Sequence, residues 1–177
     1  MEIEEKFYRD VKLMSHERFQ EEHITEMYNI LEYIENKFKE RVFDYLKSVR
    51  LEEIKDIVIG SKRHRHGGDY DNNKKSIIIN VIYFGREADE ENKKIATNEI
   101  GGLNKTFVYE IGQYLHDIED RLYRFPIMKG IYINIMKFIN EHYDFTYIKT
   151  LSDKEIRKIF AQVFSKFYFS TLDREIL

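Results

Sequence analysis

The feature that most constrains the fold is an apolar run from Ser76 to Phe84, Ser-Ile-Ile-Ile-Asn-Val-Ile-Tyr-Phe. β-Branched and aromatic side chains favour extended backbone, and a nearly continuous apolar run is typical of a strand buried on both faces. Such a strand needs neighbouring strands and covering helices. The run therefore predicts a small sheet packed against helices.

Apolar residues at three- and four-residue spacing predict helices on both sides of this run. Residues 2–49 carry the spacing, with any break near residues 15–25, so residues 1–40 are expected to form an N-terminal helical extension. Beyond the strand, the same spacing predicts helices over about residues 104–123 and 127–141.

Individual residues delimit the other elements. Pro126 separates the two later helices, because proline interrupts a helix. Ser152 and Glu155 have the spacing of a capping box, so a final helix is expected to begin there. Residues 57–59 predict a short strand and residues 60–75 a polar loop. The order of helices, a small sheet and three further helices predicts an α+β fold.

Composition sets the broad class. With 177 residues, 42% hydrophobic and 34% charged, the chain is expected to form one globular domain over residues 1–177. It has no Cys, which excludes disulfides and cysteine-ligated metals. The net charge of −3 gives no general attraction to nucleic acid.

The sequence also bears on location. No apolar run approaches the roughly 20 residues that span a bilayer. The first residues, Met-Glu-Ile-Glu-Glu-Lys, lack the basic start and apolar core of a secretory signal. A cytoplasmic protein is expected, with export by another route left open.

The segment Val108–Leu115 has the layout of a zinc-peptidase helix without the zinc ligands. Such a helix needs two His four residues apart to hold one metal, and a Glu after the first His as the general base. Glu110 stands at the position of the base, but Tyr109 and Gln113 occupy the two ligand positions. A phenol and an amide are poor zinc ligands.

Three stretches of the chain resemble the lethal-factor-like domains of anthrax toxin, a zincin-like family. Residues 67–71, followed by the Ile run at 77–79, are similar to the family's Gly-x-Tyr loop and strand. Residues 108–112, Val-Tyr-Glu-Ile-Gly, are similar to a helix in its catalytically dead branch. Residues 159–164, Ile-Phe-Ala-Gln-Val-Phe, are similar to its closing helix. The resemblance covers residues 40–177.

The resemblance implies a degenerate zincin-like fold without metal, cofactor or catalysis. Tyr109 and Gln113 stand in place of the two His ligands. Lys158 stands in place of the third ligand, a Glu, and Gln162 replaces a further acidic residue of the same helix. We therefore expect the Lys158 ammonium to replace the lost zinc and to pair with Glu110.

The dead branch of the family docks onto the pore-forming protective antigen through residues on and after the closing helix. The corresponding candidate protein-binding residues here are Phe167, Tyr168, Phe169 and Leu172, although core packing also explains part of this run. Leu172 stands where the family has a His, and the region before Ser152 is shorter than in the toxins. The resemblance therefore implies an interaction domain, with a protein other than protective antigen as its partner.

The densest polar cluster runs from Lys62 to His66. Its simplest interpretation is a solvated hairpin tip. As alternatives, Lys62, Arg63 and Arg65 could bind phosphate or nucleic acid, and His64, His66 and Asp69 could hold a metal, because alternate residues of an extended segment share one face.

A second candidate metal site uses His116, which lies on the same side of the helix as Tyr109. Glu110, Gln113 and His116 could form a rebuilt site. A partly buried His without a ligand is the simpler interpretation.

The predicted function is that of a non-catalytic protein-interaction module. It would be a toxin-type module, or an inhibitor or regulator encoded by a mobile element of a bacterium or its phage. One alternative is a zinc metallopeptidase relative with relocated ligands. The other is phosphate or nucleic-acid binding through residues 62–66.

Overall fold

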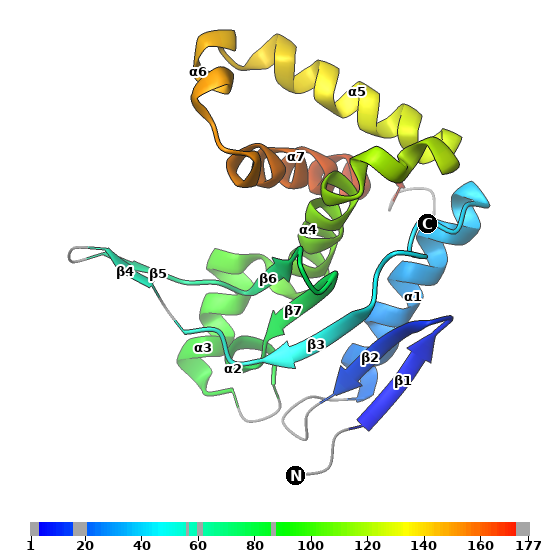
Figure 1. Ribbon diagram of the computed structural model, residues 1–177. Helices are drawn as coiled ribbons and strands as arrows, with labels where there is room; N and C mark the ends of the chain where they lie inside the picture. The colour runs from blue at the N-terminus through cyan, green and yellow to red at the C-terminus, as the bar shows by residue number, and fades with distance from the viewer. Residues whose placement is uncertain (1–3, 16–20, 56, 60–61, 86–87, 173–177) are drawn as a thin grey trace.

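A mixed five-stranded sheet lies at the centre of the molecule (Figure 1). The computed structural model describes residues 4–15, 21–55, 57–59, 62–85 and 88–172. The strands, in their order across the sheet, are β1 (Glu4–Tyr8), β2 (Val11–Ser15), β3 (Ser48–Glu52), β7 (Ser76–Asn80) and β6 (Gly68–Asp71). The β2–β3 and β3–β7 pairs are parallel, whereas β1 and β6 are antiparallel to their neighbours. The short strands β4 (Ile57–Ile59) and β5 (Lys62–His64) form a separate antiparallel hairpin.

The described helices confirm the α+β class. They are α1 (Glu21–Phe38), α2 (Val81–Phe84), α3 (Glu90–Ile95), α4 (Gly102–Asp117), α5 (Pro126–His142), α6 (Phe145–Thr150) and α7 (Asp153–Phe167). A π-helical segment, Ala96–Ile100, joins α3 to α4, a 3-10 helix, Glu119–Arg124, follows α4, and a second π-helical segment, Tyr168–Leu172, follows α7. Helix α1 packs against β1 and β2, and α4 packs against β6, β7 and α7 (Figure 1). No helix in the described ranges is long and apolar enough to cross a membrane.

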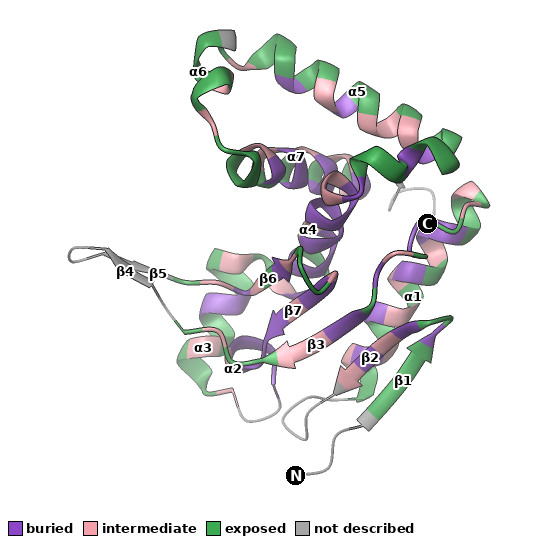
Figure 2. Ribbon diagram, in the orientation of Figure 1, coloured by how far each residue is buried: buried purple, intermediate pink, exposed green. Residues whose placement is uncertain are grey.

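The strand register separates an apolar face from a more polar one. Leu13, Val49, Ile77 and Tyr70 are neighbours across four strands, and each is at most 3% exposed. Figure 2 shows the burial of β7 and of the first part of β3 that results. The adjacent row on the other face contains Ser48 and Ser76, whose hydroxyls lie 2.6 Å apart.

The apolar run at residues 76–84 is a strand over only its first half. Strand β7 ends at Asn80, and α2 begins at Val81. Asn80 caps α2, because its side chain accepts a hydrogen bond from the backbone N–H of Ile82. The expected burial on both faces also holds only in part, since Ile78 is half-buried.

The helical extension predicted for residues 1–40 is wrong for residues 4–15, which form the β1–β2 hairpin. The helical spacing assigned to residues 2–49 also fails after α1, because residues 39–47 form turns and loop and β3 begins at Ser48. Arg9, with φ of 50°, lies in the turn of the β1–β2 hairpin. In β2 the buried side chains of Val11 and Leu13 alternate with half-buried ones, as expected for a strand. The predicted spacing is confirmed in α1, where Ile24, Met27, Leu31 and Ile34 are all buried.

The remaining predictions are confirmed in outline. The capping box of Ser152 and Glu155 is present and begins α7. Pro126 occupies the first turn of α5, where its missing N–H has no helical partner to lose. The loop predicted for residues 60–75 is wrong in part, because it contains β5 and β6.

Candidate functional site

The three stretches that carry the resemblance converge where α4 lies between β6 and α7. A Cβ on Gly68 would lie 2.9 Å from the carbonyl oxygen of Ile78 and 3.3 Å from Cγ of Glu110. A Cβ on Gly67 would lie 2.6 Å from Cγ2 of Ile100. The two glycines therefore allow α4 and the segment before it to pack directly on β6.

Helices α4 and α7 make their close approach at Gly112. A Cβ on Gly112 would lie 2.8 Å from Cα of Ala161 and 3.2 Å from Cδ1 of Phe164. Small residues at a helix crossing let the two backbones come together, and the ridges of one helix then fit the grooves of the other. The crossing fixes which side chains of α7 face α4.

A chain of hydrogen bonds joins Glu110, Gln113 and Arg157. The amide Nε2 of Gln113 donates to Oε2 of Glu110 at 2.6 Å, and Nε of Arg157 donates to Oε1 of Gln113 at 3.3 Å. Glu110 and Gln113 are each 2% exposed, and Arg157 is 8% exposed. The guanidinium carbon of Arg157 also lies 5.4 Å from the centre of the Tyr70 ring.

Burial dominates the electrostatics of Glu110. Loss of solvent raises the pKa of its carboxyl well above the usual value, and the nearby Asp69 raises it further. The Gln113 hydrogen bond and the charges of Arg157 and Lys158 oppose this shift without cancelling it. Burial, followed by the charge of Glu110, also raises the pKa of the Tyr109 phenol.

The expected pairing of Lys158 with Glu110 is wrong. Both residues are described, and no ion pair joins them; Lys158 is exposed and acts on Glu110 only through its charge. The buried cation is Arg157, one residue earlier on α7. Its signal in the sequence is a charge within the apolar stripe that continues through Phe160, Ala161 and Phe164 at three- and four-residue spacing.

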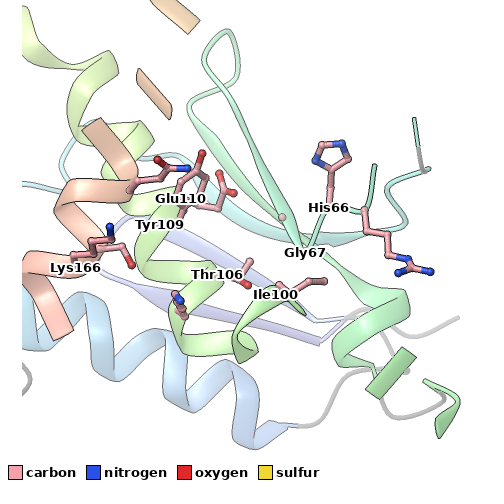
Figure 3. Close-up of a pocket in the computed structure, with 12 residues that line it drawn as sticks. His66, Gly67, Ile100, Thr106, Tyr109, Glu110 and Lys166 are labelled. Carbon is pink, nitrogen blue, oxygen red and sulfur yellow. The ribbon is translucent and has the colours of Figure 1, made fainter. Parts of the chain in front are cut away.

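A cavity of about 490 Å³ adjoins this chain of hydrogen bonds (Figure 3). Glu110 and Tyr109 line it from α4, Gln162 and Lys166 from α7, and His66 and Gly67 from the segment before β6. Three of the positions that the resemblance singles out, Tyr109, Glu110 and Gln162, therefore line an open space, whereas Gln113 is buried and does not line it.

The basic cluster does not form the tip of a hairpin, because residues 62–64 are strand β5 of the β4–β5 hairpin and residues 65–66 follow that strand. The side chains of Lys62, Arg63 and His64 lie outside the described residues. Arg65 pairs with Glu99 at 3.0 Å. His66 is half-buried, and its carbonyl accepts a hydrogen bond from Nδ2 of Asn80 at 2.7 Å.

The side chain of His64, a ligand of the first candidate metal site, lies outside the described residues, and the second candidate site does not gather enough ligands in the described part of the chain. There, no three His, Asp or Glu side chains lie close enough together to hold a metal ion. The His116 ring packs 5.4 Å from the Phe160 ring and 5.9 Å from the Tyr132 ring. Burial lowers the pKa of His116.

The C-terminal aromatic residues divide between core and surface. Tyr168 is 3% exposed, and its ring packs against Tyr33 at 6.3 Å, so a partner does not reach it in this conformation. Phe167 and Phe169 are half-buried, and the side chain of Leu172 lies outside the described residues. Phe167 also lines an apolar groove of about 400 Å³ between α5 and α7.

No protein-family model, curated protein or solved structure matches this chain.

Proposed function

We propose that this chain is a non-catalytic protein-interaction module with a degenerate zincin-like, lethal-factor-like fold. The observation that carries the proposal is the buried Glu110–Gln113–Arg157 chain. It joins the position of the general base to a ligand position by hydrogen bonds, and it brings a buried cation to them.

The buried guanidinium disfavours a metal at this place. A charge of +1 and a charge of +2 about 5 Å apart repel each other by roughly 6–7 kcal/mol at an effective dielectric constant of about 20. Gln113 also uses its amide oxygen to accept from Arg157. A zinc ion would have to displace Arg157 and would gain only weak ligands in return.

The cleft beside β6 supplies a surface for a partner. Among the described strands, β6 is hydrogen-bonded on one side only, to β7. A strand with a free edge can accept an extended segment of another protein by backbone hydrogen bonds, while adjacent pockets select its side chains. The cavity lined by Tyr109 and Gln162 is such a pocket.

A metal assay tests the loss of catalysis. We expect the purified protein to hold no stoichiometric zinc, to melt at the same temperature with and without a chelator, and to cleave no peptide. Bound zinc at one equivalent, or a melting temperature lowered by the chelator, would instead support the metallopeptidase alternative.

A gain-of-function variant tests the ancestry of the cleft. The substitutions Tyr109→His, Gln113→His and Lys158→Glu restore the ligand types at the three positions that the resemblance assigns to them, and a fourth, Arg157→Ala, removes the buried cation that would repel the metal. We expect this variant to bind one zinc per chain. The control Ile133→His with Lys137→His places two His at the same spacing on the exposed side of α5, and it should bind zinc far more weakly. Equal zinc affinity of the two variants would count against a zincin-like cleft.

An affinity experiment tests the interaction role. Gln162→Arg adds a long charged side chain at the cavity, and Asn140→Arg adds one at an exposed position on α5. We expect a partner captured from bacterial lysate by the wild-type protein and by Asn140→Arg to be lost with Gln162→Arg. Retention of every captured protein by Gln162→Arg would exclude the cleft as the binding surface.

One observation favours the enzymatic alternative. A buried carboxyl with a raised pKa beside a cavity is what a general acid requires, and Glu110 has both properties. Peptide hydrolysis by the zinc-loaded protein that is lost with Glu110→Gln would establish that alternative.

A further inference from the structure

Two lysines without acidic partners face the cavity beside Glu110. Lys105 lines it from the first turns of α4, and Lys166 lines it from α7. Neither forms an ion pair with any residue that the structure describes. Glu110 is the sole acidic residue among the described lining residues, and Gln113 already donates to its carboxylate. The cavity therefore has an excess of positive charge, although the whole chain has a net charge of −3.

A buried hydroxyl of the same cavity lacks a partner. Ser165 is 4% exposed, and its Oγ has no hydrogen-bond partner among the described residues. Across the cavity from Lys166 (Figure 3), the buried Nε2 of His66 also lacks a partner among the described residues. Buried polar atoms nearly always have a partner, because an unpaired one is unfavourable. Both residues line the cavity, so a ligand that enters it comes close to these unpaired atoms.

The start of α4 adds a further positive contribution. Gly101 and Gly102 have φ of 91° and 86°, and no side chain caps the helix. Ile100, Lys105 and Thr106, which flank this terminus, all line the cavity. The N-terminus of a helix carries partial positive charge and free N–H groups, which favour an anion nearby.

We propose that this cavity binds an oxyanion, a carboxylate or a phosphate group, on an acidic segment of the partner protein. Lys105 and Lys166 pair with the anion, and the Ser165 hydroxyl donates a hydrogen bond to it. The inference rests on the proposed function for the nature of the ligand, since the free edge of β6 lies next to the cavity and suits an extended peptide.

The composition of the cavity favours a peptide over a nucleic acid. Single-stranded nucleic acids bind along rows of aromatic side chains on which successive bases stack. Tyr109 is the one tyrosine, and the lining holds no phenylalanine, among the described residues. The volume of about 490 Å³ accommodates a few side chains.

Fluorescence anisotropy with labelled synthetic peptides tests the proposal. The probes are hexaglutamate, a Gly-Ser peptide with one phosphoserine, and the same Gly-Ser peptide without phosphate. We expect the wild-type protein to bind at least one acidic probe and not the neutral one, with an affinity that falls as salt is added. The stronger of the two acidic probes shows whether carboxylate or phosphate is the better ligand.

Matched variants connect the binding to the cavity. Lys105→Gln with Lys166→Gln should weaken binding of the acidic probe by about tenfold, because each lysine is exposed and an exposed ion pair contributes up to about a factor of 5. Ser165→Ala should weaken it severalfold without lowering the melting temperature, since the hydroxyl has no partner to lose. Lys137→Gln with Lys154→Gln removes two exposed lysines that do not line the cavity, and it should change the affinity less than twofold.

Three results would overturn the inference: no binding of either acidic probe by the wild-type protein, equal weakening by the cavity and control lysine pairs, or unchanged affinity in the cavity pair. The measurement uses synthetic peptides and no metal. A failure of the proposed function, seen as bound zinc or as retention of every captured protein by Gln162→Arg, is therefore distinguishable from a failure of the anion site.

Discussion

Replacing Gly112 with alanine tests how closely α4 and α7 approach each other. The new methyl carbon would lie 2.8 Å from Cα of Ala161 and 3.2 Å from Cδ1 of Phe164. Carbon atoms pack best at about 3.5–4.0 Å, so the helices would have to separate by roughly half an ångström or more. Ala161 and Phe164 are buried completely, and the nearest contact is backbone, which cannot move away as a flexible side chain does.

Two effects of opposite sign determine the stability change. Overpacking a well-packed core costs about 1–3 kcal/mol, and the rigid contact at Gly112 places this site near the upper end of that range. Alanine in place of glycine inside a helix contributes about 1 kcal/mol in favour of folding. We therefore expect Gly112→Ala to lower the free energy of unfolding by about 1–2 kcal/mol, and to lower the melting temperature by about 2–8 °C for a chain of this size.

Gly130 provides the matched control. It lies within α5, and an added Cβ would have no atom within 4 Å. Gly130→Ala gains the same helix propensity without a clash, so it should raise the free energy of unfolding by about 0.5–1 kcal/mol. Urea denaturation followed by circular dichroism gives both values under the same conditions. If Gly112→Ala stabilised the protein as much as Gly130→Ala does, the close crossing of α4 and α7 would be refuted.

Three further substitutions test the buried groups and a helix cap. The stability of Glu110→Gln relative to the wild type should rise with pH above about 4.5, by up to about 1.4 kcal/mol per pH unit. The reason is that the folded wild type keeps a proton on Glu110 that its unfolded state releases. Urea denaturation at several pH values measures this difference, and a difference independent of pH would contradict the raised pKa. Ser152→Ala should lower the free energy of unfolding by about 1 kcal/mol, since it removes the hydroxyl that accepts a hydrogen bond from the backbone N–H of Glu155. An unchanged urea midpoint would show that the capping box contributes nothing to stability. Tyr8→Phe should lower the free energy of unfolding by about 1.5–3 kcal/mol, because the Tyr8 phenol donates a hydrogen bond to the buried carboxylate of Glu35. A loss below about 0.5 kcal/mol in thermal and urea denaturation would mean that this carboxylate finds another donor.

The sequence predicted correctly those elements that depend on neighbouring residues alone, such as the spacing of apolar residues along a helix or the motif at its start. The spacing in α1 and the capping box of α7 are properties of neighbouring residues, and both are present as predicted. The β1–β2 hairpin was missed because charged residues hide its alternation and because β2 pairs with β3, which lies more than thirty residues later in the chain. Strand preference depends strongly on such distant neighbours.

The end of β7 illustrates the same limit. Nothing in the apolar run marks Asn80 as its last residue. Its side chain donates to the carbonyl oxygens of His66 and Ile54, at 2.7 Å and 3.2 Å, and its backbone N–H donates to the carbonyl of Gly67. These partners come from segments that are adjacent only in the folded chain. The buried asparagine is thus paired by tertiary contacts, and the backbone turns into α2 there.

The candidate site, too, was predictable from the sequence only in part. The residue types at positions 109 and 113 exclude the zinc ligands of a working peptidase helix whatever the fold, because affinity for zinc is a property of the side chain itself. Which cation of α7 reaches the site could not be read from spacing. Successive helical residues point about 100° apart, so the rotation of α7 about its axis decides whether Arg157 or Lys158 faces α4.

The sequence alone therefore determined that Glu110 is flanked by a phenol and an amide where imidazoles would be needed. Only the tertiary structure decided that Arg157 is the buried cation and that Lys105, Lys166 and Ser165 share one cavity with Glu110. The physical reason is the crossing at Gly112 and Ala161, where direct backbone contact sets the rotation of α7 and thus the side chains that it turns inward.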